Sequence, residues 1–150
     1  MKRNGIMVVL LFILAQAQAQ RLSDSVAIRL LLEKESATWR SGDIKAHADC
    51  WQIRPYSRIL ISTGDGTVID VPPAAMLNPP PGSAGQGGYS VNTDYKMGIG
   101  KTTAWVSHQE ESVDVNGKST YSYEIRMLEK VKGQWKLVGQ SIHVYKPNNG

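Results

Sequence analysis

The sequence predicts an α+β fold in which two helices precede a strongly curved antiparallel sheet. Helical periodicity is confined to the first third of the chain, and apolar runs separated by turn residues fill the rest. Elements that segregate in this way predict helices packed on one side of a sheet. The longest runs hold roughly 13 residues and must bend in a domain this small, so we expect a cone-shaped sheet with the helices on its concave side.

A secretory leader precedes the predicted domain. Lys2 and Arg3 give it a positive start, Ile6–Leu14 is an unbroken apolar run, and Ala15–Ala19 offers small residues at signal-peptidase spacing. The apolar run is too short to span a bilayer, which favours a signal peptide at 1–19 over an uncleaved membrane anchor. We therefore expect an exported protein, periplasmic or extracellular, with no membrane anchor after cleavage.

The remaining 131 residues suit one domain with one hydrophobic core. The leader removes two of the 17 basic residues, which leaves 15 against 13 acidic ones. They form no basic stripe, so we expect no nucleic-acid partner. Cys50 is the only cysteine, so no internal disulfide can form, and we expect it to be a small buried hydrophobe.

Two helices open the domain. Ser23 is a good N-cap, and an apolar stripe at helical spacing predicts a helix that continues to Arg40. Gly42 can adopt the left-handed conformation that ends a helix, and Asp43 then caps a second, short helix over 44–51.

Strands are predicted for most of the rest of the domain, which extends over 20–147. The expected strands are 58–63, 67–71, 89–98, 102–115, 119–131 and 134–146. A single helical turn is expected at 74–77, and Pro and Gly residues predict a loop over 78–88 that is either a lid or a surface excursion. The tail, 148–150, is expected to be disordered.

A bent sheet that helices close only in part leaves a hollow, so we expect an interior pocket for a small apolar or amphipathic molecule. The expected ligand-binding residues are aromatic: Trp39, Trp51, Tyr95, Trp105 and Tyr123. Such aromatic residues also pack cores, and that alternative stays open. We expect no cofactor.

The opening helices resemble those of the nuclear transport factor 2-like superfamily. The likeness rests on Ile28-x-x-Leu31-Leu32 and Ala37-x-Trp39-x-x-Gly42-Asp43, and on the closing hairpin with Lys132-Gly133-Gln134-Trp135-Lys136-Leu137-Val138. Together these motifs resemble the small bacterial members grouped as polyketide-cyclase-like (SnoaL-like) or as domains of unknown function. The resemblance implies a cystatin-like roll with an interior pocket and a homodimer packed through the sheet, but no single activity, because relatives include enzymes and binding modules.

The sequence departs from the enzymatic branches of that superfamily. Glu35 and Ser36 stand where ketosteroid-isomerase-like members place a phenol, and Arg58–Leu60 lacks the isomerase carboxylate. Gly139–Ser141 stands where many domains of unknown function have a His-rich motif. The isomerase chemistry is therefore not carried over.

Glu35 is the leading candidate for chemistry because it interrupts an apolar helical stripe. A carboxylate pointing into the cone can serve as a general acid or base, since burial raises its pKa unless a cation lies near. Two alternatives remain, a structural pair with an Arg or Tyr of the sheet and a solvated position at the edge of the stripe. Alternation along the last strand places Trp135, Leu137, Ser141, His143 and Tyr145 on one face.

His143 is the second catalytic candidate. Beside Tyr123 it would form a polar patch suited to a ligand hydroxyl or carboxylate, and the alternative is a histidine at a dimer interface or on the surface. His108 and Glu110 share one face of their strand, but two ligands are too few to indicate a metal, and we expect no metal site.

Two functions follow from these patterns. The first is an exported, non-catalytic domain that binds a small molecule or dimerises. The second is a small isomerase, dehydratase or cyclase that uses Glu35 with a His or Tyr partner for proton transfer.

Overall fold

The computed structural model describes the backbone of residues 3–147 and the side chains of Gln20 and of residues 23–147. The helices are α1 (Arg3–Ser41), α2 (Ile44–Ala48) and α3 (Pro73–Leu77). The strands are β1 (Ile59–Ser62), β2 (Val68–Val71), β3 (Tyr89–Ile99), β4 (Thr103–Val113), β5 (Ser119–Val131) and β6 (Gln134–Tyr145). The predicted tail at 148–150 lies outside the described residues.

The strands form one six-stranded sheet in the order β2-β1-β6-β5-β4-β3. The α+β prediction is confirmed, with one correction to the pairing. The sheet is mixed, because β1 runs parallel to β6, with Ile59 opposite Gln140, while every other neighbouring pair is antiparallel. Parallel neighbours need a crossover connection, and the whole segment from β2 to β5 supplies it.

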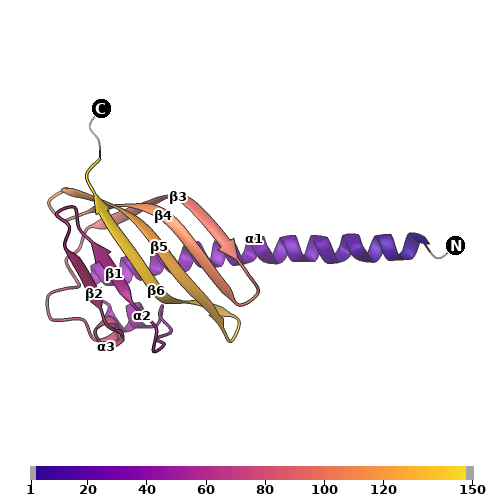
Figure 1. Cartoon of the computed structure of the whole chain (residues 1–150), viewed down its shortest axis with the longest axis horizontal. Helices are drawn as coiled ribbons and strands as arrows, with labels where there is room; N and C mark the ends of the chain where they lie inside the picture. The colour runs from indigo at the N-terminus through magenta and orange to yellow at the C-terminus, as the bar shows by residue number, and fades with distance from the viewer. Residues whose placement is uncertain (1–2, 148–150) are drawn as a thin grey trace.

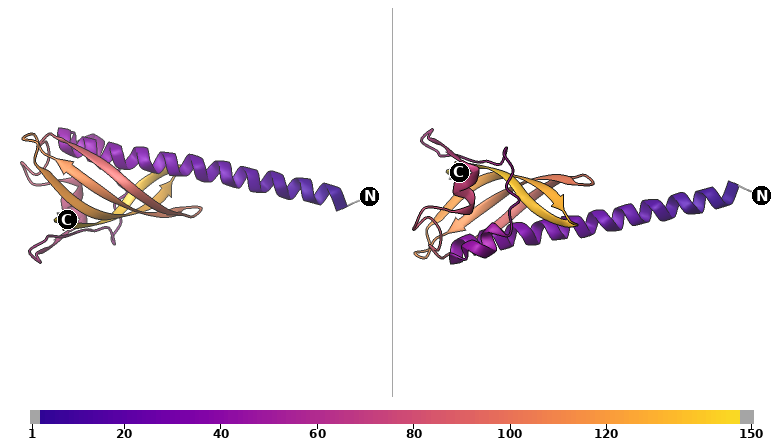
Figure 2. Two further views of the ribbon diagram at one scale, coloured as in Figure 1. Left: turned by 90° about the horizontal axis from the view of Figure 1, so that it is seen from above. Right: turned by 90° about the horizontal axis from the view of Figure 1, so that it is seen from below.

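Helix α1 lies along the concave side of the curled sheet, and its N-terminal half extends beyond the sheet (Figures 1 and 2). The helix begins at Arg3, so Ser23 is an interior residue and not the predicted N-cap. The residues before Ser23 include Leu, Ala and Gln, which favour helix, and no proline or glycine interrupts the chain between Ile6 and Ser23. Within the described residues, no helix is both long and apolar enough to cross a membrane.

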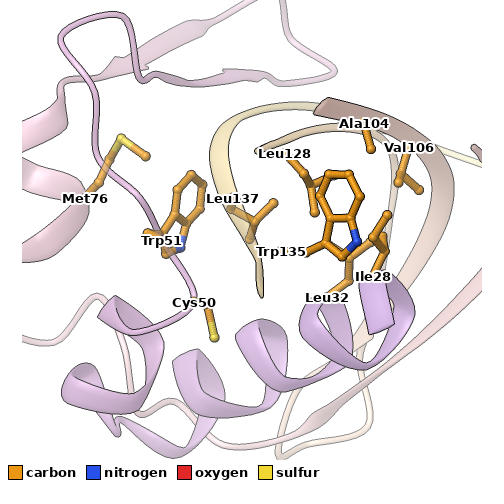
Figure 3. Packing of buried hydrophobic residues seen from close by; sticks show 10 residues of the cluster. All are labelled: Ile28, Leu32, Cys50, Trp51, Met76, Ala104, Val106, Leu128, Trp135 and Leu137. Atoms are coloured by element: carbon orange, nitrogen blue, oxygen red, sulfur yellow. The ribbon is translucent and has the colours of Figure 1, made fainter. Parts of the chain in front are cut away.

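The core lies between α1 and the inner face of the long strands (Figure 3). Ile28 and Leu32 are one turn apart on α1 and are buried against β-strand residues that include Trp135 and Leu128. Cys50 is a free, fully buried thiol in the same core, as predicted.

A bulge in β6 reverses the facing of its second half. Met127 is opposite Gly139, but Leu128 is opposite Leu137, so Val138 is an extra residue on β6. Trp135 therefore faces α1. The odd-numbered residues after the bulge, such as His143 and Tyr145, lie on the outer face instead. The predicted common face of Trp135, Leu137, Ser141, His143 and Tyr145 is wrong, because strict alternation does not survive an inserted residue.

Candidate functional site

A buried cluster of charged side chains lies under α1, next to the apolar core. Glu35 on α1 accepts a hydrogen bond at Oε2 from Arg126 Nη1 on β5, at 2.9 Å. The other terminal nitrogen of Arg126 lies 2.5 Å from Glu124 Oε2. All three side chains are at least nine-tenths buried, so the guanidinium joins the helix to the sheet away from bulk water.

The spacing of residues along α1 and β5 brings Glu35, Glu124 and Arg126 together between the helix and the sheet. Glu35 follows Ile28 and Leu32 at helical spacing, so the stripe that packs on the sheet also carries the carboxylate. Glu124 and Arg126 are two residues apart on β5 and therefore share its inner face.

Glu124 is held by further donors and contacts from three strands. Ser122 Oγ and Gln140 Nε2 donate to its oxygens at 3.0 and 3.1 Å, and His108 Nε2 lies 3.8 Å from Oε2. Burial and the nearby Arg126 lower the pKa of His108 to about 4, so its ring is neutral at pH 7. Burial opposes the charge of Arg126, but the surrounding carboxylates, Glu124 foremost, raise its pKa above the usual value.

Glu110 is the member of the cluster whose pKa is raised into the neutral range. It forms an ion pair with Arg40 of α1 at 3.0 Å, and its other carboxylate oxygen is buried with no partner among the described residues. Burial and the neighbouring Glu124 raise the pKa of Glu110 to about 7. The cluster can therefore gain or lose a proton near neutral pH.

Several buried polar atoms around this cluster have no hydrogen-bond partner among the described residues. They are Arg40 Nε, Asn92 Oδ1, Tyr95 Oη, His108 Nε2, Glu110 Oε2 and Arg126 Nε. Buried polar groups in folded proteins are almost always satisfied by protein or by ordered water. The interior at this end of the sheet is therefore polar and not apolar.

The structure separates the two predicted catalytic residues. Glu35 is buried under α1, with His47 Nε2 3.7 Å from its Oε1. His143 is exposed on the outer face, where it is directly opposite Tyr123 and shares a 2.9 Å hydrogen bond with Ser141 Oγ. The two side chains do not form an acid–base pair, because they lie on opposite faces of the sheet.

The predicted ligand-binding aromatic residues also divide between the two faces. Trp39 and Trp51 flank His47, with ring centroids 5.0 and 6.3 Å from its ring. Tyr95 stacks on His108 at 5.2 Å inside the cone. Trp105 and Tyr123 lie on the outer face and are about half exposed, so they do not line an interior pocket.

The outer face of β4 and β5 presents a continuous apolar patch, which we call the outer patch: Trp105, Tyr123, Ile125 and Met127. These four side chains are 43–53% exposed. Trp105 is directly opposite Met127, and the other two follow at alternate positions along β5. The patch contains no charged side chain, which is unusual for the solvated face of a sheet.

Two hollows open elsewhere on the described surface. One of about 250 Å³ lies over the ends of β3 to β6 on the outer face, between Tyr121 and Tyr145. The other, of about 300 Å³, lies between Gly42, Ile44 and the proline loop 79–81. Among the described residues, no group of three His, Cys, Asp or Glu side chains could hold a metal ion.

Sequence reasoning missed Arg126 and Glu124 as members of the site. Their signal was present, because they alternate with exposed residues on the same strand and share parity with Leu128, which is buried. Two opposite charges at i and i+2 on the face of a strand that also carries a core leucine indicate a buried ionic pair.

The arrangement of α1 against a curled sheet has counterparts among solved structures. An NTF2-like protein with a cystatin-like fold from Novosphingobium aromaticivorans superposes with a TM-score of 0.67 at 14% identity, over 90% of each chain. The chain has the nuclear transport factor 2-like fold. This confirms the fold expected from the opening helices and the closing hairpin.

Two other structures with this fold extend the comparison. An NTF2-like protein of unknown function from Shewanella baltica covers 84% of this chain and 97% of its own, with a TM-score of 0.57 and 17% identity. A candidate Ca/calmodulin-dependent kinase II association domain from Exiguobacterium sibiricum covers 83% and 95%, with a TM-score of 0.60 and 13% identity. At these identities the likeness concerns the fold alone. No family model matches the sequence, and no curated protein sequence matches it significantly.

Proposed function

We propose that this chain is an exported module that forms a homodimer through the outer face of its sheet. The outer patch carries the proposal, because monomeric proteins rarely leave a large contiguous apolar surface in water. The patch lies on β4 and β5, neither of which is an edge strand. A second copy can approach it without obstruction from α1, which covers the other face (Figure 2).

A second copy is the occupant that the chemistry favours. The patch is apolar and has no charge at its centre, so two copies can face each other without bringing like charges together. A structural neighbour whose name describes an association domain supports assembly as a role for this fold.

The oligomeric state of the purified protein tests this proposal. We expect sedimentation equilibrium to give twice the mass of one chain, and we expect Ile125→Lys to weaken the dimer about a hundredfold, because it buries an unpaired charge. Val68→Lys is the matched control, since Val68 is an exposed strand residue outside the patch. A monomeric wild type, or an Ile125→Lys protein that dimerises normally, would contradict the proposal.

A second candidate, an enzyme that uses Glu35 for proton transfer, has one observation in its favour, the buried His47 next to the carboxylate. Against it, Arg126 donates a hydrogen bond to Oε2 of Glu35, so that this carboxylate is part of a buried ion pair between the helix and the sheet. We therefore assign Glu35 to stability.

The Glu35→Gln variant separates these roles. The substitution removes the negative charge of Glu35 and leaves the buried positive charge of Arg126 without one of its two carboxylate partners. It should lower the unfolding free energy, measured by urea denaturation, by about 3 kcal/mol. Glu33→Gln, an exposed change on the same helix, should cost less than about 0.5 kcal/mol. A Glu35→Gln protein of unchanged stability would instead return Glu35 to the list of catalytic candidates.

A further inference from the structure

The hollow on the outer face lies where the outer sides of four strands meet at one end of the sheet. One row across the sheet there is Val91, Glu111, Tyr121 and Tyr145, each opposite the next. The next row includes Thr93 and Gln109, which also line the hollow. The hollow is thus a property of cross-strand register. It adjoins the outer patch where Tyr123 stacks on Tyr145, but none of its lining residues belongs to the patch.

Carboxylates on this surface are held in place by hydroxyl and amide donors. Ser119 Oγ and Tyr121 Oη donate to Glu111 Oε1 at 2.7 and 3.0 Å. Tyr145 Oη donates to Gln109 at 3.1 Å, and Gln109 in turn donates to Asp94 Oδ2 at 2.5 Å.

A bulge in β3 supplies the second carboxylate. The register shifts between Thr93 and Lys96, and Asp94 within this interval has a φ of 54°. Bulges commonly redirect a side chain, and here the carboxylate of Asp94 reaches the amide of Gln109, a residue of the outer face. The backbone conformation is one that Asp and Asn adopt more readily than most residues.

These two carboxylates lack a cation. Within the described part of the chain, all ion pairs use other acidic residues, and neither Glu111 nor Asp94 lies within 4.0 Å of a Lys, Arg or His nitrogen. Their hydrogen-bond donors are neutral. The surface around the hollow therefore carries negative charge that the protein itself does not neutralise.

Aromatic rings complete the surroundings. Tyr121 and Tyr145 line the hollow with ring centroids 6.1 Å apart, and Tyr123 stacks against Tyr145 at 4.9 Å. Aromatic side chains next to carboxylates attract organic cations through both the ring quadrupole and the full charge.

We propose that this hollow binds a small organic cation of the alkylammonium class. Its volume of about 250 Å³ is below that of most sites for drug-sized ligands, which suits a compact head group. A hard metal ion fits less well, because no three potential ligands converge among the described residues.

Isothermal titration of the full mature chain with choline chloride tests the proposal. The control ligand is 3,3-dimethylbutan-1-ol, which has the same shape without the charge. We expect choline to bind about tenfold more tightly than the alcohol, because only choline gains from the carboxylates and the rings. Equal affinity for the two compounds, or no heat from choline up to about 10 mM, would overturn the proposal.

Variants locate the site and separate it from dimerisation. Glu111→Gln and Asp94→Asn should each weaken choline binding several-fold, and the Asp94 change keeps a residue that tolerates its backbone conformation. Glu129→Gln, at the other end of β5, is the matched control and should leave binding unchanged. Ile125→Lys should also retain binding, so a failed dimer would not remove the site. Unchanged affinity in both Glu111→Gln and Asp94→Asn would contradict the assignment.

Discussion

At the scale of single residues, the interior is governed by a small imbalance of charge. Glu35, Glu110 and Glu124 face only two guanidinium groups, those of Arg40 and Arg126. Burial is the main cause of the raised pKa of Glu110, and the neighbouring Glu124 raises it further against the opposing charges of Arg126 and Arg40. One carboxylate oxygen of Glu110 also has no hydrogen-bond partner among the described residues.

The raised pKa of Glu110 has a consequence for stability that can be given a sign. The folded protein binds this proton up to about pH 7, whereas the unfolded chain releases it near 4.5, so this contribution to stability is full below 4.5 and is lost as pH rises through 7. His108 acts in the opposite sense. Its pKa is lowered to about 4 from 6.5, so its contribution is full above 6.5 and is lost as pH falls through 4.

Between pH 4.5 and 6.5 the two slopes oppose each other, and substitution should expose one of them. In Glu110→Gln we expect the unfolding free energy to rise with pH through this window, relative to wild type, by roughly 3 kcal/mol at most. In His108→Gln the remaining Glu110 slope should make stability fall over the same window. Urea denaturation at several pH values measures both, and parallel pH profiles for all three proteins would contradict this account.

At the scale of elements, irregular positions decide which side chains meet. The bulge at Val138 turns the odd-numbered residues after it, such as His143, to the outer face, and the bulge at Asp94 places a carboxylate beside the outer hollow. The turn at Lys132 and Gly133 has positive φ at both residues, which joins β5 to β6 in a tight hairpin.

Gly88, which precedes β3, offers a test at this scale. Its φ is 77°, and a Cβ atom there would overlap the carbonyl oxygen of Val113 at the end of β4. We expect Gly88→Ala to lower the unfolding free energy by about 3 kcal/mol through backbone strain and this overlap. Gly117→Ala is the matched control, because Gly117 has a φ of 78° with open space around its Cα, and it should cost only about 1 kcal/mol. Equal losses of stability in the two variants would show that the overlap is relieved.

At the scale of the whole molecule, the two faces of the sheet carry different kinds of side chain. The inner face carries the apolar core and the ionic cluster that join it to α1, and the outer face carries the patch and the hollow to which we assign assembly and binding. The two faces can differ in this way because successive side chains of each strand point to opposite faces of the sheet.

The proposed export concerns the segment before the domain. Cleavage after Ala19 would leave Asp24, which accepts hydrogen bonds from Trp135 and Lys130 and so joins α1 to the sheet. We expect N-terminal sequencing of the exported protein to begin at Gln20. A chain that retains its first nineteen residues would point to the membrane-anchored alternative.

Most helices and strands of this protein could be predicted from the sequence alone, because the patterns that indicate them involve residues close together in the chain. Helical spacing, glycine turns and alternating strands are set by neighbours along the chain, and they predicted β5 at its observed bounds and the long strands around it to within a few residues. They also singled out Glu35, since a carboxylate in an apolar stripe is visible in sequence.

Only the tertiary structure decided which partners these residues meet. The parallel pairing of β1 with β6, the bulge at Val138 and the capture of Glu35 by Arg126, 91 positions away, depend on long-range register and packing. The continuation of α1 back to Arg3 was missed for a different reason, since a good N-cap residue also tolerates a helix interior when the preceding residues favour helix. Local pattern can place a charge on a face of an element, but the identity of its counter-charge is settled by where the other elements pack.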